Sequence, residues 1–499
     1  MLARWFVVLL LGVAAASSST GASIDALDGF GQPVDWWAIL KLPSQVKNAA
    51  GKLVPTCDCT APSCTDDKAR GSGLCYLYAD AKNPTFRYFK DLGYDCLGQG
   101  GNDPLSHTLK QKASSPYWAY YNDQFYAIAQ GDSTARQCSG TNTFNAHAKG
   151  FLAFDAITGG VALQASIPNY PDPSDDASGF VPLGCQGENN VQYAQHIFAM
   201  SLPATSVDAL GRGLQVARVC SANFYKADAD IMTSASLRAA NVPSSLQSMV
   251  DALTKPRLPK TPSTTLVLET KAKMAITSVF KAGIDALPPW ALVAQSLNTD
   301  VSAATWWDGA SGIPTLCAGD VYASASHAFC IGRPLNLTSD GTFTFNVENL
   351  VAATFPLPNM GQVSWSLLGG VGAGGNHAKW GLSTPRKTGT RSLSVFGDLN
   401  MEGFPCSTNC AGSQGGRGGA FHALNVPALH ESLASLVSSV CSCEMKSAGY
   451  VQARMCNAGC YKRLGDTFRE EELPTLTTST SYWSKNAALA RNHSYDPSP

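Results

Sequence analysis

The chain has little unbalanced charge and, after its first 16 residues, no long apolar run. Its 36 Lys and Arg residues against 37 Asp and Glu residues give a formal net charge of −1 over 499 residues, which excludes a strong basic field at neutral pH. A membrane-spanning helix needs about 20 apolar residues, and no later segment supplies them. The 44% hydrophobic and 15% charged residues are typical of a globular protein. We therefore expect a folded, soluble chain, long enough for two domains or one duplicated unit.

Histidine is also scarce, but two of the 8 His residues lie in the same short pattern. His147 precedes Lys149 by two residues, and His377 precedes Lys379 by the same spacing. On an extended strand such residues point to one face, so each pair can bind one anion. Two facing pairs would supply one imidazole to attack phosphorus and another to protonate the leaving oxygen. The spacing alone fits a phosphodiester-cleaving site at these four residues and fits equally well, for each pair, a surface His beside a solvated Lys.

The two His-x-Lys triplets are residues 147–149 and 377–379. The sequence around both triplets resembles the deoxyribonuclease II family of the phospholipase D superfamily. The blocks that carry the resemblance occur in the family's order and cover roughly residues 28 to 440: residues 31–37, 41–43, 121–124, 147–150, 166–171, 193–195, 377–380, 397–400 and 417–419. The resemblance implies an α/β fold in which two phospholipase-D-like halves, each a mixed β-sheet flanked by helices, form a pseudo-dimer in one chain. Both His-x-Lys pairs would then meet in a central cleft.

The resemblance also implies an activity, which is acid endonucleolytic hydrolysis of DNA without a metal or other cofactor. His147 would attack phosphorus and form a phosphohistidine, His377 would protonate the departing 5′ oxygen, and water would release a 3′-phosphate. Lys149 and Lys379 would hold the non-bridging oxygens. DNA is the only partner implied. Protonation of all 8 His would take the net charge from −1 to −1 + 8 = +7, which suits a polyanion binder that works in acid.

Four further residues look like polar supports for the two pairs. Asp155 follows the first triplet and is predicted to orient His147, which marks that ring as the nucleophile. Ser383 stands where the superfamily has a second acid, and Ser166 and Asn400 resemble the polar residues that follow each triplet. No His or carboxylate cluster with metal-ligand spacing lies near either pair. The missing second acid disfavours a lipid phosphodiesterase; that enzyme and a catalytically inactive DNA-binding homologue are the alternatives.

The beginning of the chain and its cysteines predict a secretory route. Residues 1–22 read as a signal peptide, with Arg4 before a short apolar core. The 16 Cys imply disulfides, and residues 336–338 and 492–494 are glycosylation sequons. A zinc site built from Cys441, Cys443, Cys456 and Cys460 is the less favoured alternative. We expect a lysosomal or secreted protein with no membrane anchor after the leader is removed.

The remaining organisation follows composition and periodicity. We expect a first half over residues 23–240, a Pro-rich extended linker over 241–262, a second half over 263–440 and a Cys-containing tail over 441–499. Strands are predicted over residues 125–129 and 362–368, a hairpin over 150–155 and 161–166, and a closing amphipathic helix over 429–440. Trp306 and Trp307 are predicted to be a buried aromatic pair rather than a base-stacking platform.

Overall fold

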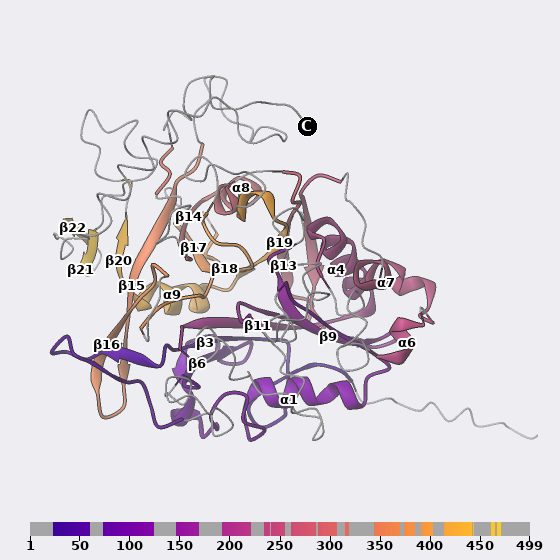
Figure 1. Ribbon diagram of the computed structural model, residues 1–499, viewed down its shortest axis with the longest axis horizontal. Helices are drawn as coiled ribbons and strands as arrows, with labels where there is room; N and C mark the ends of the chain where they lie inside the picture. Colours follow the sequence, from indigo (N-terminus) through magenta and orange to yellow (C-terminus); the bar gives the residue numbers. More distant parts are fainter. Residues whose placement is uncertain are drawn as a thin grey trace, which may run out of the picture.

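The computed structural model shows a mixed α/β protein that is dominated by strands (Figure 1). It describes residues 23–59, 73–123, 146–168, 192–220, 234–239, 241–254, 261–285, 288–306, 315–318, 344–369, 374–384, 391–402, 414–441, 443, 461–464 and 467–470. The predicted α/β class is confirmed. The leader, the strand expected at 125–129 and most of the tail lie outside the described residues.

The first sheet is antiparallel throughout and runs in the order β7-β6-β3-β11-β10-β9-β8. Its strands are Arg87–Tyr88 (β7), Tyr76–Asp80 (β6), Trp36–Lys41 (β3), Gln195–Leu202 (β11), Gly159–Ala165 (β10), Lys149–Asp155 (β9) and Tyr117–Tyr121 (β8). β9 and β10 form the predicted hairpin, and β9 begins at Lys149, so the first triplet leads directly into the sheet.

The second sheet has a main path of β12-β13-β19-β18-β17-β14-β15-β16-β4-β5 and is mixed, because β14 and β15 are parallel. Its strands are Thr264–Glu269 (β12), Ala275–Lys281 (β13), Gly419–Asn425 (β19), Leu393–Gly397 (β18), Trp380–Thr384 (β17), Asp300–Ala304 (β14), Val347–Leu357 (β15), Gly361–Ser366 (β16), Gln45–Lys47 (β4) and Leu53–Pro55 (β5). Val437–Cys441 (β20) branches from β15 and continues into Tyr461–Leu464 (β21) and Thr467–Glu470 (β22). A separate pair joins Ala26–Leu27 (β1) to Pro33–Val34 (β2).

Six strands of each sheet repeat the same spatial order. The path β6-β3-β11-β10-β9-β8 matches β12-β13-β19-β18-β17-β14, and every pairing in both paths is antiparallel. β9 and β17, which follow the two triplets, occupy equivalent places. The two paths thus share one spatial order, although β3 precedes β6 in the sequence whereas β12 precedes β13. The pseudo-dimer of two phospholipase-D-like halves stays a prediction.

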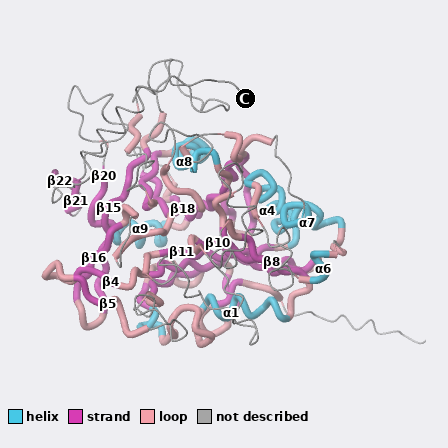
Figure 2. The backbone as a smooth tube through the Cα atoms, viewed as in Figure 1, coloured by secondary structure: helices cyan, strands magenta, loops and turns pink. Residues whose placement is uncertain are grey.

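Helices lie between the sheets and on their outer sides (Figure 2). Ala204–Ala217 (α4) contacts β9, β10 and β11 of the first sheet and β12, β13 and β19 of the second, so it is packed between them. Pro427–Leu436 (α9) contacts β15, β17 and β18, and Pro289–Leu297 (α8) covers the other face of the second sheet at β13 and β14. Pro104–Lys110 (α1), capped by the side chain of Asp103, packs against β1, and the short helix Ala235–Arg238 (α6) follows later in the chain.

One apolar core joins the two sheets through α4 and α9, and a second core lies beneath α8. In the first, Leu210 and Leu214 of α4 and Leu433 of α9 are buried with side chains from both sheets. In the second, Trp290 packs edge-to-face on Phe421 of β19. This continuous packing fixes the sheets relative to each other, which a site built from both requires.

Two predicted segments differ from the structure. Within the predicted linker, Gln247–Thr254 forms helix α7 and packs on α4, because Met249, Val250 and Leu253 give it a buried face. Residues 255–260 lie outside the described part, and the domain boundaries stay predictions. The closing helix ends at Leu436, and the β-branched Val437 begins β20. Among the described residues, no helix combines the length and apolar character needed to cross a membrane.

Candidate active site

The first triplet is fixed by backbone from α4 and from the second half of the chain. The amide of Ala146 donates to the carbonyl of Arg218, the left-handed residue that ends α4, at 2.9 Å. The amide of His147 donates to the carbonyl of Gly418 at 2.8 Å. Gly418 approaches α4 so closely that a Cβ atom there would lie 1.8 Å from the carbonyl oxygen of Ala217. Only glycine fits this position, so the glycine directly before β19 has a structural cause.

The second triplet is fixed in the same way by the first half. The amide of His377 donates to the carbonyl of Ala194 at 2.7 Å, and the amide of Ala194 donates to the carbonyl of Gly375 at 2.9 Å. Ala194 also forms an isolated parallel bridge with Asn376. Ala194 directly precedes β11 and Gly418 directly precedes β19, which are equivalent strands. Each imidazole is therefore positioned by the half to which it does not belong.

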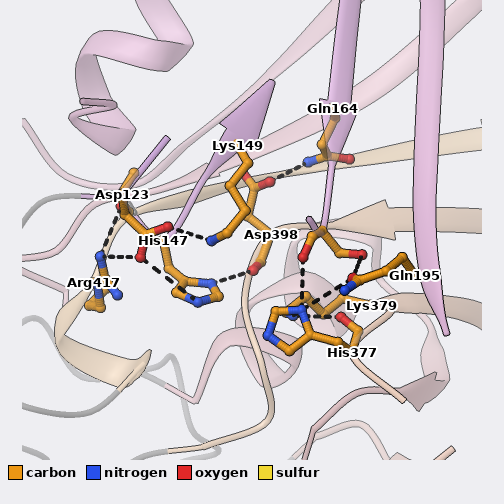
Figure 3. Close-up of polar contacts among 11 residues, drawn as sticks. Asp123, His147, Lys149, Gln164, Gln195, His377, Lys379, Asp398 and Arg417 are labelled. Atoms are coloured by element: carbon orange, nitrogen blue, oxygen red, sulfur yellow. Dashed lines mark hydrogen bonds and ion pairs between the residues drawn. The ribbon is translucent and has the colours of Figure 1, made fainter. Parts of the chain in front are cut away.

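The imidazole rings of His147 and His377 lie next to each other, with their centroids 6.4 Å apart and their planes at 57° (Figure 3). Nδ1 of His147 lies 2.9 Å from the carbonyl oxygen of Asp398. Nδ1 of His377 lies 2.8 Å from the carbonyl oxygen of Ser166. A carbonyl oxygen only accepts, so Nδ1 of each ring carries a hydrogen and Nε2 of the neutral ring keeps its lone pair. Both rings are thus held in the tautomer that leaves Nε2 for nucleophilic or acid–base chemistry.

The carboxylate of Asp123 contacts the basic side chains next to His147 (Figure 3). Its carboxylate is bonded to the ammonium of Lys149 and lies 2.9 Å from the guanidinium of Arg417. The same carboxylate lies 3.9 Å from Nε2 of His147, too far for a hydrogen bond. Burial acts to raise the pKa of Asp123, but Lys149, His147 and Arg417 outweigh it and hold the pKa far below its usual range. These neighbours therefore favour the ionised form of Asp123.

Burial and neighbouring cations lower the pKa of both imidazoles. The pKa of His147 is lowered well below its usual value by burial and then by Lys149, and Asp123 opposes the shift. The pKa of His377 is lowered well below its usual value by burial and then by Lys379, Lys149 and His147. Lys379 donates to the carbonyl of His377 at 2.7 Å, which holds its ammonium against that ring. An anion bound between the rings would act in the opposite direction and favour protonation.

Two glutamine side chains hydrogen-bond to the residues whose carbonyls contact the imidazoles. Nε2 of Gln164 on β10 donates to the carboxyl group of Asp398 and to the carbonyl of Ala420, each at 3.0 Å. Oε1 of Gln195 on β11 accepts from the hydroxyl of Ser166 at 2.6 Å and lies 3.2 Å from Nδ1 of His377. These contacts fix the carbonyls that set the tautomers, so both glutamines are positioning residues.

The structure brings the four His-x-Lys residues together and places Ser166 beside them, through its carbonyl. Asp155 lies elsewhere: six residues beyond Lys149 on an extended strand is about 20 Å away. Its carboxylate accepts from the amides of Ile157 and Thr158 and closes the β9–β10 turn. Its predicted role in orienting His147 therefore does not fit this position, and the carboxylate near that ring belongs to Asp123.

The other two predicted supports do not contact an imidazole. Ser383 closes the end of β17, where its hydroxyl donates to the carbonyl of Arg391 at 2.7 Å and accepts from the amide of Leu393 at 2.8 Å. Asn400 is buried near the site and its amide lies 3.4 Å from Glu402. Burial raises the pKa of Glu402 to about 7.

Sequence reasoning missed the residues that reach the site from other segments. Asp123, Asp398 and Arg417 all lie in blocks that carry the family resemblance, which was the available signal, whereas Gln164 had none. Trp306, expected to be buried as a pair, is half-buried and lies edge-to-face on His377, with ring centroids 5.4 Å apart. Its predicted partner Trp307 lies outside the described residues.

Three disulfides are described: Cys57–Cys75, Cys59–Cys96 and Cys317–Cys443. The zinc alternative is wrong for Cys443, because a disulfide occupies its sulfur. The side chains of the other three cysteines of that alternative lie outside the described residues. Disulfides are typical of an oxidising compartment, in keeping with the predicted secretory route.

The fold and the site define a class of mixed α/β proteins in which two His-Lys pairs, far apart in sequence, lie close together. Within that class, the family model for deoxyribonuclease II matches residues 26–443, so the chain belongs to the deoxyribonuclease II family. It is similar to deoxyribonuclease-2-alpha of Mus musculus, at 28% identity over 37% of this chain and 42% of the relative. It is also similar to deoxyribonuclease-2-alpha of Sus scrofa, at 30% identity over 37% of this chain and 41% of the relative. The matched segment thus spans about two fifths of these relatives.

Proposed function

We propose that the chain is an acid endonuclease that hydrolyses DNA phosphodiester bonds through a phosphohistidine and leaves 3′-phosphate ends. The observation that carries this proposal is the pair of imidazoles, one from each half, with centroids 6.4 Å apart and each Nδ1 on a carbonyl. Membership of the deoxyribonuclease II family and the names of the similar proteins point to DNA as the substrate. The disulfides support a lysosomal or secreted location.

His147 is the nucleophile in this proposal. Its Nε2 attacks phosphorus while the bond to the 5′ oxygen breaks, and the ring gains positive charge as the N–P bond forms. The carboxylate of Asp123 lies 3.9 Å from Nε2 and stabilises the charge. Asp123 thereby replaces Asp155 as the reason to assign the nucleophile to the first triplet. The carbonyl of Asp398 accepts from Nδ1–H throughout the step.

His377 is the general acid. Its Nε2 donates a proton to the departing 5′ oxygen and then takes a proton from the water that releases the 3′-phosphate from His147. Because burial and then Lys379, Lys149 and His147 lower its pKa, His377 gains this proton only when the phosphate anion is bound and the solution is acidic. Cleavage should therefore rise as the pH falls from neutral toward about 5.

Three basic side chains are available to bind the negative oxygens of the reacting phosphate. Lys149 and Lys379 come from the two triplets, and Arg417 adds a guanidinium whose side chain is 18% exposed, so it can reach a ligand while it pairs with Asp123. Groups fixed before the reaction stabilise charge in the transition state without reorganising. The site chemistry thus needs only side chains present in this chain.

The proposal is tested with supercoiled plasmid at pH 5 in EDTA. The wild type should nick the plasmid and leave 3′-phosphate ends. His147→Ala and His377→Ala should each lose at least about 10²-fold in rate, the scale of general acid–base catalysis. His430→Ala is the matched control, because His430 lies on α9, where its Nε2 lies 2.9 Å from the carbonyl oxygen of Ser383. Activity that appears only after Mg²⁺ is added, or that survives in both alanine variants, would overturn the proposal.

A further inference from the structure

Two buried lysines occupy equivalent places at the ends of equivalent strands. Lys41 ends β3 and is 1% exposed, and Lys281 ends β13 and is 0% exposed. β3 pairs with β11, and β13 pairs with β19, so each lysine lies beside the strand that follows a supporting carbonyl. Burying an ammonium is costly unless hydrogen bonds compensate, so such a pair needs an explanation. Neither lysine belongs to a His-x-Lys pair.

The ammonium groups make matching contacts with backbone carbonyls. Nζ of Lys41 donates to the carbonyl of Tyr193 at 2.6 Å and to that of its own neighbour Leu42 at 3.2 Å. Nζ of Lys281 donates to the carbonyl of Arg417 at 2.9 Å and to that of its own neighbour Ala282 at 3.2 Å. Lys41 therefore links the end of β3 to the residue two positions before β11. Lys281 links the end of β13 to the residue two positions before β19 in the same way.

Those tied segments are the ones that hold the imidazoles of the opposite half. Tyr193 directly precedes Ala194, whose carbonyl accepts from the amide of His377. Arg417 directly precedes Gly418, whose carbonyl accepts from the amide of His147.

Resting on the proposed function, we propose that Lys41 and Lys281 are positioning residues that act crosswise, Lys41 on His377 and Lys281 on His147. Each ammonium fixes one peptide segment, and that segment fixes the backbone of one imidazole. Burial lowers the pKa of both lysines to about 7, so both carry their charge in acid, when the hydrogen bonds are needed. Neither Lys41 nor Lys281 touches phosphate.

The test substitutes Lys41→Met and Lys281→Met, and Lys112→Met as the matched control. Lys112 is also buried, at 8% exposed, but lies over the ring of Trp118. Methionine has a similar volume and removes the charge, and such replacements of buried ions are often tolerated. Gln at positions 41 and 281 keeps a donor and should restore part of the lost positioning.

The first readout does not depend on activity. Brief acylation with diethylpyrocarbonate, followed by peptide mass spectrometry, reports the exposure and order of each imidazole. We expect Lys41→Met to raise labelling of His377 several-fold and leave His147 unchanged, and Lys281→Met to do the reverse. His422 is buried on β19 outside both contact chains and serves as the internal reference.

The second readout separates the two chemical roles. Loss of His377 positioning should reduce plasmid cleavage by about 10²-fold but spare a nitrophenyl phosphodiester, whose leaving group needs no proton. Loss of His147 positioning should reduce both. Equal labelling of both rings, no change in labelling, or a matching rise at His422 would each overturn the crosswise assignment. A wild type without nuclease activity would refute the proposed function and leave the labelling result able to decide the positioning.

Discussion

Replacing the carboxylate of Asp123 tests the electrostatic account of the site most sharply. Asp123→Asn keeps the shape of the side chain but leaves the ammonium of Lys149 and the guanidinium of Arg417 without an anion. The side chains of Asp123 and Lys149 are 2% and 1% exposed, so water cannot replace the lost partner. Breaking a buried ion pair by removing one member costs about 3–5 kcal/mol of the free energy of unfolding.

The matched control is Asp208→Asn on α4, which removes the carboxylate from an i,i+4 pair with Arg212. The side chain of Arg212 is 56% exposed, so this change should cost less than about 1 kcal/mol. Denaturant unfolding with the disulfides intact measures both variants. Since the pKa of Asp123 lies far below the value near 3.9 of the unfolded chain, its stabilisation is present above that value and persists at pH 5. Equal free energies of unfolding for the two variants at pH 5 would refute the reasoning.

Three further outcomes follow from the same geometry. Asp155→Asn should leave plasmid cleavage within about twofold of wild type, because Asp155 closes a surface turn. A loss as large as that of His147→Ala would show that Asp155 acts in the active site. Cys317→Ser should lower the free energy of unfolding by about 2–5 kcal/mol, and an unchanged unfolding midpoint would contradict a Cys317–Cys443 bond. Burial lowers the pKa of His422 to about 3. Below about pH 6.5 the unfolded chain therefore binds more protons than the folded chain, and the free energy of unfolding decreases as the pH falls. His422→Gln should remove about 2 kcal/mol of the decrease between pH 7 and pH 5, and an unchanged slope on denaturant unfolding would contradict it.

Local pattern was enough to predict the hairpin and the two triplets. Alternating side chains and the glycines at 159 and 160 define β9 and β10, because strand and turn preferences act over a few residues. The His-x-Lys spacing placed two reactive groups on one face for the same reason. Where tertiary pairing decides, local pattern failed: β20 replaces the last turn of the predicted helix because β15 offers it a partner.

The surroundings of the rings could not be predicted from spacing. Asp155 is near His147 in sequence, but an extended strand carries it away, whereas Asp123 comes from the end of a neighbouring strand. The carbonyls of Asp398 and Ser166 carry no residue-type signal, because any residue has a carbonyl. Only the packing of the two sheets brings these groups across the junction.

The most direct test of the central claim is to trap the covalent intermediate. Wild-type protein is mixed with a radiolabelled nitrophenyl phosphodiester at pH 5, quenched in base, where phosphohistidine is stable, and digested to peptides. We expect acid-labile phosphate on the peptide that contains His147, and none on that peptide in His147→Ala. Phosphate on the peptide that contains His377 would reverse the roles of the two rings. Turnover with no phosphate on either peptide would contradict the phosphohistidine.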